Sequence, residues 1–310
     1  MKIGERIKQR MTFSFEVFPP KEDDGIPGLQ AELKELFRFS PDFVSCTYGA
    51  GGTNAGKSRE ICKFIAGSAV TCMSHFTCIG NSKRDILEIV KSYIDLGIEN
   101  FLPLRGDFPK DPQTGKARTN TDGDFEHANF LIGFLKENFP AISMGCAGYA
   151  EKHILAPSLE SDIAFLKAKQ DAGAEFIMLQ LCHDISAFSR FREKCYRAGI
   201  RLPMVMGLMP VLSRDSIINM TVSNGCSIPP ELAAIIGKYT PVRGASEVVV
   251  RETAADFKKA GMEYTVKSLW GYMAAGVDGI HIYTLNRSPD VAKIVSDSGI
   301  KTTVVRGKIS

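Results

Sequence analysis

Polar and reactive side chains recur in this sequence at the ends of short apolar segments. The first is Glu16, on the polar side of the alternating segment 12–18, which Pro19 and Pro20 bring to an end. Such alternation with aromatic and β-branched residues is typical of a strand, and proline ends a strand because it lacks an N–H donor. A carboxylate on a buried strand face is costly. Glu16 is therefore either a harmless residue of a solvated edge strand or part of a reactive site.

Later apolar segments end in the same way, and they decide between these alternatives. The groups at their ends are Thr47 and Tyr48, His75 and Thr77, Arg105, Gly106 and Asp107, Tyr149 and His153, Gln180, Met209 and Pro210, and Tyr283 with Arg287. One polar strand end is unremarkable. Polar groups at nearly every strand end predict a site where those ends meet.

The elements that must position these groups alternate regularly between strand and helix. Strands are expected at 12–18, 42–49, 71–78, 100–106, 141–149, 176–182, 202–211 and 279–285. Helical spacing of apolar residues predicts helices at 28–39, 57–65, 83–96, 125–138, 159–172, 187–197 and 290–297, and a longer helical region over 214–275 with breaks at Gly225, Pro229, Pro230, Pro241 and Gly261.

This pattern predicts an α/β fold, a single (β/α)8 barrel over residues 1–310 with a helical insertion before the last strand. Most of the strands are apolar on both faces, as parallel strands covered by helices must be. An open, doubly wound sheet is the alternative, because strand order cannot be read from a sequence.

The composition is that of an ordinary globular protein. The 310 residues are 44% hydrophobic and 24% charged, with a net charge of +3. This near balance indicates neither a nucleic acid nor a membrane as partner, and no segment is typical of a signal peptide or a membrane span. We therefore expect a cytoplasmic protein. The cysteines form no Cys-x-x-Cys pair and the histidines no metal-binding spacing, so we expect buried thiols and no metal site.

One motif points to a different chemistry. Residues 51–58, Gly-Gly-Thr-Asn-Ala-Gly-Lys-Ser, match the phosphate-loop pattern between a strand and a helix. Such a loop also needs an apolar strand ending in an Asp that helps to hold magnesium, and none is evident. Nucleotide hydrolysis is thus an alternative function, and a glycine-rich loop whose amides face some other ligand is the favoured interpretation.

Other candidates also have ordinary interpretations when taken singly. Arg105 and Asp107 around Gly106 could be a surface ion pair that closes a turn, and His75 could be a satisfied core histidine. Asp162 and Lys169 lie two turns apart on one helix, which is usually a solvated face. They become ribose and phosphate contacts only if a nucleotide lies along that helix.

Taken together, the motifs resemble the flavin-dependent 5,10-methylenetetrahydrofolate reductases of the bacterial type. The resemblance covers about residues 12–287. It is carried by Phe13-Ser14-Phe15-Glu16-Val17-Phe18-Pro19-Pro20, Val44-Ser45-Cys46-Thr47-Tyr48-Gly49-Ala50, His75-Phe76-Thr77-Cys78, Leu104-Arg105-Gly106-Asp107, Asp171-Ala172-Gly173-Ala174 with Gln180, Phe188-Ser189-Arg190-Phe191-Arg192, and Tyr283-Thr284-Leu285-Asn286-Arg287.

The resemblance implies a (β/α)8 barrel that holds FAD at the carboxyl ends of its strands and uses NADH or NADPH as donor. The implied flavin contacts are Thr47, Tyr48, His75, Arg105, Gly106, Asp107, Ala128, Tyr149, His153, Asp162 and Lys169. Glu16 and Asp107 are the implied catalytic residues. Asp107, Gln180 and Arg287 are the implied folate contacts.

The implied reaction is the reduction of 5,10-methylenetetrahydrofolate to 5-methyltetrahydrofolate with ping-pong kinetics. Opening the methylene bridge needs a proton near N10, and Glu16 is assigned as the acid. We expect burial and like-charge repulsion from Asp107 to raise the pKa of Glu16. Asp107 would stabilise the cation that develops on the substrate.

Four positions depart from the family pattern. Met220 stands where an aromatic residue often packs on the nicotinamide donor, Phe165 and Ala168 replace polar and basic groups, and Lys57 belongs to the phosphate-loop match. The departure at Met220 permits an alternative, a flavin-binding subunit that takes electrons from a partner protein. A homo-oligomer is expected in either case.

Overall fold

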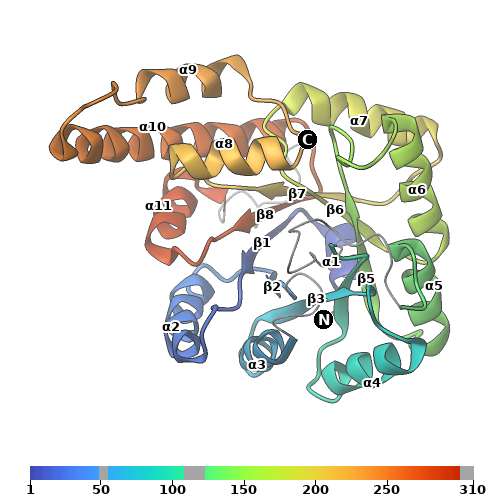
Figure 1. Cartoon of the computed structure of the whole chain (residues 1–310). Helices are drawn as coiled ribbons and strands as arrows, with labels where there is room; N and C mark the ends of the chain where they lie inside the picture. Colours follow the sequence, from blue (N-terminus) through green and yellow to red (C-terminus); the bar gives the residue numbers. More distant parts are fainter. Residues whose placement is uncertain (49–54, 108–122, 301–310) are drawn as a thin grey trace, which may run out of the picture.

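In the computed structural model, eight parallel strands close into a barrel in the order of the sequence (Figure 1). The structure describes residues 1–48, 55–107 and 123–300. The strands are β1 (Thr12–Val17), β2 (Phe43–Cys46), β3 (Thr71–Thr77), β4 (Asn100–Leu104), β5 (Ser143–Gly148), β6 (Phe176–Leu179), β7 (Met204–Leu208) and β8 (Gly279–Tyr283). Pairing of β1 with β8, from Thr12 with Gly279 to Glu16 with Tyr283, closes the barrel. The predicted barrel is confirmed, and the open sheet is excluded.

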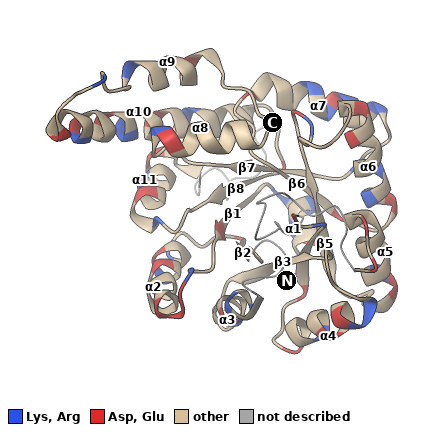
Figure 2. Cartoon of the chain, viewed as in Figure 1, with Lys and Arg blue, Asp and Glu red and all other residues tan. Residues whose placement is uncertain are grey.

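Helices cover the outside of the barrel, as the alternating pattern predicts. They are α2 (Ile26–Phe37), α3 (Ala55–Ala66), α4 (Lys83–Ile94), α5 (Ala128–Asn138), α6 (Leu159–Asp171), α7 (Ile185–Arg197) and α11 (Ser288–Ser298), with the short 3-10 turn η1 (Asp23–Gly25) before α2. Figure 2 shows acidic and basic residues mixed over these outer helices, while the strands carry few charges. Among the described helices, none is long and apolar enough to cross a membrane.

The pleat of β1 separates two layers of side chains. Phe13, Phe15 and Val17 point outward into the core between strands and helices, whereas Ser14 and Glu16 alternate with them and face the barrel interior. The expected inward position of Glu16 is therefore confirmed.

An N-terminal helix that the sequence analysis did not predict closes the amino end of the barrel. In α1 (Ile3–Gln9), Ile3 and Ile7 are buried in an interior cluster with Phe43, Met73 and Phe176. The Ile3 N–H donates to Asn100 Oδ1 over 2.8 Å, and the Gly4 N–H donates to the Ser143 hydroxyl over 3.1 Å. The feature of the sequence that indicates this helix is the spacing of Ile3 and Ile7 by one helical turn. The basic residues around these two positions obscured it.

The predicted helical insertion lies between β7 and β8. It consists of α8 (Arg214–Ser223), α9 (Pro230–Lys238) and α10 (Glu247–Ala274), and α9 with the start of α10 extends beyond the barrel in Figure 1. The expected break at Gly261 is wrong, because α10 continues through it. Gly261 is needed for packing: a Cβ there would overlap the Val211 carbonyl.

Candidate functional site

A cavity of about 590 Å³ opens at the carboxyl ends of the strands. It brings together nearly every side chain singled out from the sequence, namely Glu16, Thr47, Tyr48, His75, Thr77, Arg105, Gly106, Asp107, Ala128, Tyr149, His153, Asp162, Lys169 and Gln180. This is the end at which (β/α)8 barrels carry their active sites. The size is in the range of ligand-binding pockets.

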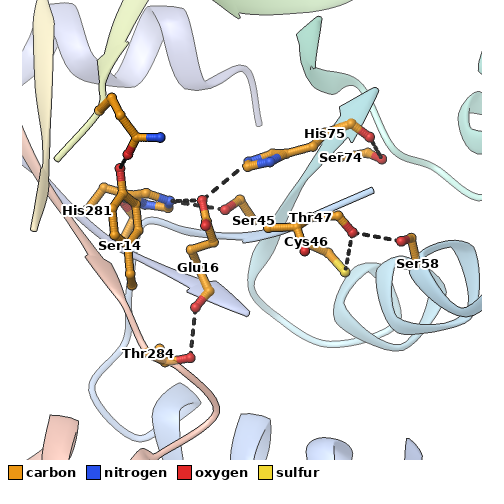
Figure 3. A network of polar contacts seen from close by, with 12 residues as sticks. Ser14, Glu16, Ser45, Cys46, Thr47, Ser58, Ser74, His75, His281 and Thr284 are labelled. Carbon is orange, nitrogen blue, oxygen red and sulfur yellow. Dashed lines mark hydrogen bonds and ion pairs between the residues drawn. The ribbon is translucent and has the colours of Figure 1, made fainter. Parts of the chain in front are cut away.

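Glu16 is the acidic group deepest in this cavity, with 8% of its surface exposed. Its Oε2 lies 3.5 Å from His75 Nε2 and 3.4 Å from His281 Nε2 (Figure 3). The Thr284 N–H and hydroxyl both donate to the Glu16 carbonyl, over 3.0 and 2.7 Å, which ties the end of β1 to the end of β8. The carboxylate is thus held between two imidazoles.

The expected direction of the Glu16 pKa is wrong for this structure. Burial raises the pKa, but hydrogen bonding with His281 and the charges of His75 and His281 outweigh it, and the net pKa lies below the ordinary value. The groups that decide the direction are therefore histidines, and Asp107 stands at the exposed rim of the cavity.

His281 is a site residue that the sequence analysis missed. It is fully buried, its Nδ1 lies 2.7 Å from the Ser14 hydroxyl, and its Nε2 lies 3.0 Å from the Ser45 hydroxyl. The feature of the sequence that indicates it is the alternation in β8, where the inward-facing His281 and Tyr283 alternate with Ile280 and Ile282 of the outer core. Tyr283 lines the cavity, and His281 acts on the site through its contact with Glu16.

Two buried polar atoms in the cavity wall lack a hydrogen-bond partner. His75 Nε2 and Thr77 Oγ1 make no hydrogen bond within the described part of the chain. Burial is the main influence on the pKa of His75 and lowers it, while the nearby Glu16 carboxylate acts in the opposite direction. A buried polar atom without a hydrogen bond is costly, so Thr77 Oγ1 indicates a site shaped for a ligand with polar groups, whereas His75 Nε2 already faces Glu16 Oε2.

Charged and aromatic side chains of β5, α6 and the loop between them line another part of the cavity. Lys169 Nζ donates to the Ala147 carbonyl over 2.9 Å, and Asp162 Oδ2 accepts from the His153 N–H over 2.8 Å. Tyr149 packs edge-on against His153, with ring centroids 4.6 Å apart. Asp162 and Lys169 of α6 therefore face the cavity and are not a solvated face.

The strand end at Gly106 needs a glycine. Its φ is +89°, and a Cβ would lie 2.9 Å from both Thr77 Cβ and Ile79 Cγ2. The Arg105 Nε–H donates to the Gly106 carbonyl over 3.1 Å. This close approach places Arg105 and Asp107 on either side of the turn at the cavity rim.

The described part of the phosphate-loop match does not face this cavity. Residues 51–54 lie outside the described residues. Lys57 pairs with Asp23 over 3.2 Å and donates to the Lys21 carbonyl, and the buried Ser58 hydroxyl donates to the Thr47 carbonyl over 2.7 Å. The Ser58 hydroxyl is thus engaged where a phosphate loop would present it to magnesium.

The remaining predicted positions lie at the edge of the cavity or outside it. Arg287 is exposed before α11 and is not part of the cavity lining. Phe165 and Met220 line the mouth with 43% and 41% of their surfaces exposed, and Ala168 is outside the lining. Within the described residues, no group of His, Cys, Asp or Glu is arranged to hold a metal ion.

Known proteins resemble this chain over nearly all of its length. The family model for methylenetetrahydrofolate reductase matches residues 2–299. Methylenetetrahydrofolate reductase (NADH) 1 of Arabidopsis thaliana is 31% identical, over 97% of this chain and 51% of that protein. The 5,10-methylenetetrahydrofolate reductase of Pectobacterium carotovorum is 29% identical, over 97% of this chain and 94% of that protein.

A solved structure agrees with the fold. A Clostridium thermocellum protein, described as binding two copies of 5-methyl-5,6,7,8-tetrahydrofolic acid, superimposes with a TM-score of 0.62 at 11% identity, over 96% of this chain and 99% of that chain. This chain spans about half the length of the Arabidopsis relative. The family match covers the barrel and every strand end that lines the cavity. The chain therefore belongs to the methylenetetrahydrofolate reductase family.

Proposed function

We propose that this chain reduces 5,10-methylenetetrahydrofolate to 5-methyltetrahydrofolate with bound FAD and a reduced nicotinamide donor. The observation that carries the proposal is that Glu16 meets the implied flavin contacts and two implied folate contacts, Asp107 and Gln180, in one cavity. Names of relatives include both NADH and NADPH. One shared cavity favours donor and folate acting in turn, with ping-pong kinetics.

The residues present fit FAD. Within the described residues Thr77 Oγ1 is buried without a hydrogen-bond partner and lies beside His75 in the lining, which suits the polar edge of a ring system. Arg105 and Lys169 in the wall suit a phosphate-bearing group, and Asp162 suits a ribose hydroxyl. When bound, FAD supplies the two-electron chemistry, and the protein supplies position and charge.

Glu16 is proposed to hold the proton that opens the methylene bridge at N10. In the ligand-free cavity its pKa is lowered. A ligand that fills the cavity excludes the remaining water, and burial is already the largest influence that raises this pKa. Substrate binding therefore favours the protonated acid when it is needed.

Asp107 and Arg287 are proposed to act on the folate from the rim. The Asp107 carboxylate is exposed at the end of β4, where it can pair with a pterin edge and stabilise the cation that develops at N5. Arg287 is exposed next to the cavity-lining strand end of β8 and suits the carboxylates of the glutamate tail.

Glu16→Gln tests the proposal. The amide keeps the size of the side chain but cannot deliver a proton, so oxidation of the reduced flavin by methylenetetrahydrofolate should slow by at least about 10²-fold. Reduction of the flavin by NADH or NADPH needs no such proton and should stay within about tenfold of wild type. Stopped-flow flavin absorbance measures both steps.

The control is Glu22→Gln, which changes an exposed carboxylate outside the cavity lining and should alter neither step. Equal slowing of both steps in Glu16→Gln would mean that Glu16 positions the cofactor. A purified protein without a flavin spectrum that fails to bind added FAD would refute the cofactor assignment.

A further inference from the structure

The side-chain amide of Gln180 is held in one orientation at the end of β6. Its Oε1 accepts from the Leu181 N–H over 2.8 Å and lies 3.0 Å from the Tyr283 hydroxyl. A backbone N–H can only donate, so the amide atom that faces it must be the carbonyl oxygen. This contact settles the assignment of oxygen and nitrogen, which is otherwise ambiguous for glutamine.

The other end of the same amide is available to a ligand. Gln180 is half-buried and lines the cavity. Its Nε2 makes no hydrogen bond within the described residues, while both hydrogen bonds of the side chain use Oε1. Gln180 could in principle offer a donor and an acceptor, but its acceptor is already occupied and two N–H donors remain.

Tyr283 reaches Gln180 because Gly207 leaves room for it. Tyr283 projects inward from β8, and a Cβ on Gly207 in β7 would overlap the Tyr283 hydroxyl and the Leu179 carbonyl. The same hydroxyl lies 3.3 Å from the Leu179 carbonyl oxygen. Both of its neighbours are acceptors, so the hydroxyl acts as a donor. Burial raises the pKa of Tyr283 well above its ordinary value, which keeps the hydroxyl protonated.

We propose that Tyr283 is a positioning residue that, with the Leu181 N–H, holds Gln180 as a hydrogen-bond donor, so that the cavity selects a ligand with an acceptor at this point. The matching chemistry is a ring nitrogen or ring carbonyl of a heteroaromatic ligand. A ligand that offers only N–H groups there would leave donors facing donors, which is costly in a buried site. This inference rests on the proposed function, with the pterin ring as the ligand.

Gln180→Glu gives the sharpest test. One carboxylate oxygen can still accept from the Leu181 N–H and Tyr283, but the other would face the ligand's acceptor with lone pairs. The Kd for tetrahydrofolate, which carries no one-carbon unit to transfer, should rise at least about tenfold at pH 8. At pH 5 the introduced carboxyl begins to take up a proton and can donate again, so the ratio to wild type should shrink.

Gln180→Ala is the matched variant, since it removes the donor without adding a titrating group. Its Kd relative to wild type should be raised equally at pH 8 and pH 5. Anaerobic calorimetry with tetrahydrofolate on the FAD-loaded protein measures all of these values. Wild-type affinity in Gln180→Glu at pH 8 would mean that the ligand donates to Gln180, which would overturn the proposal.

Tyr283→Phe tests the positioning role separately. The ring remains and only the hydroxyl is lost, so the Kd should rise about threefold to tenfold. In the double variant Tyr283→Phe with Gln180→Ala, loss of the hydroxyl should add nothing, because there is no amide left to hold. Tyr196→Phe, at an exposed tyrosine on α7, is the control and should leave the Kd unchanged.

The outcomes separate this inference from the proposed function. A wild-type protein that neither binds tetrahydrofolate nor reduces methylenetetrahydrofolate would refute the function. Normal wild-type binding with additive effects of Tyr283→Phe and Gln180→Ala would refute only the coupling between these two residues.

Discussion

Glu16 shows how a single residue at this site takes its properties from groups distant in sequence. A carboxylate inside a barrel is expensive, and here two imidazoles face the same oxygen at 3.5 and 3.4 Å. They come from β3 and β8. The same neighbours that make the charge tolerable also lower its pKa, so a bound ligand is needed to favour the protonated acid.

A third buried histidine, His183, gives a prediction on stability against acid. Burial lowers the pKa of His183 from 6.5 to about 4, and its Nε2 has no hydrogen-bond partner within the described residues. The unfolded chain binds a proton near the ordinary pKa and the folded protein only near pH 4, so stability is lost as the pH falls between these values. By pH 5 the free energy of unfolding should have fallen by about 2 kcal/mol because of this histidine.

His183→Leu removes this proton linkage. The free energy of unfolding, measured with urea at pH 7.5 and pH 5, should fall by about 2 kcal/mol less in the variant than in wild type over that interval. The same loss in both proteins would show that other groups cause the acid sensitivity.

At the scale of elements, two contacts position the loops around the cavity. After β8 the chain turns through Leu285 and Asn286, with φ of 51° and 52°. The Asn286 amide then pairs with the backbone of Phe18, accepting over 3.0 Å and donating over 2.7 Å. The side chain thus continues the pairing of β1 with β8 beyond their last backbone bonds.

The second contact joins α10 to the loop after β7. The Thr265 hydroxyl donates to the Gly261 carbonyl over 2.7 Å and accepts from the Val211 N–H over 3.0 Å. Gly261→Ala would favour the helix by up to about 1 kcal/mol. We still expect a net loss of about 1–3 kcal/mol, because the new methyl group would overlap the Val211 carbonyl.

The matched control is Gly133→Ala in the interior of α5. There the nearest atom to the new Cβ lies 4.0 Å away, so the substitution should stabilise by up to about 1 kcal/mol. Thermal unfolding of both variants gives the comparison. If Gly261→Ala unfolds at a higher temperature than wild type, the loop after β7 must shift to accommodate the new methyl group without a loss of stability.

At the scale of the whole molecule, the two ends of the barrel have separate tasks. The cavity occupies the carboxyl end, and α1 seals the amino end with Ile3 and Ile7. Stability and function should therefore respond to different substitutions.

Ile7→Ala tests this separation. Ile7 is 1% exposed in the interior cluster, so its truncation should cost about 2–5 kcal/mol of unfolding free energy. The KM for methylenetetrahydrofolate and the flavin spectrum should stay unchanged, because Ile7 itself is not part of the cavity lining. The control is Lys8→Ala, at an exposed residue next to Ile7. It should leave the unfolding free energy, the KM and the flavin spectrum unchanged. A raised KM in Ile7→Ala would show that the two ends are coupled.

The amino-acid sequence is sufficient to predict the succession of strands and helices and most of the residues at the strand ends. Those features depend on local periodicity: the inward position of Glu16 follows from the pleat of β1, and the shared face of Asp162 and Lys169 follows from the turn of α6. Once strands alternate with helices in a closed parallel barrel, their carboxyl ends must meet.

The tertiary structure alone decided which groups contact one another across the barrel. The pKa of Glu16 depends on His75 and His281, the orientation of Gln180 depends on Tyr283 and Gly207, and the continuity of α10 depends on Val211 beside Gly261. These partners lie far apart in sequence, and their distances follow from strand register and barrel closure. Hydrogen bonds, charge interactions and steric overlap act over a few ångströms, so spacing along the chain could not reveal them.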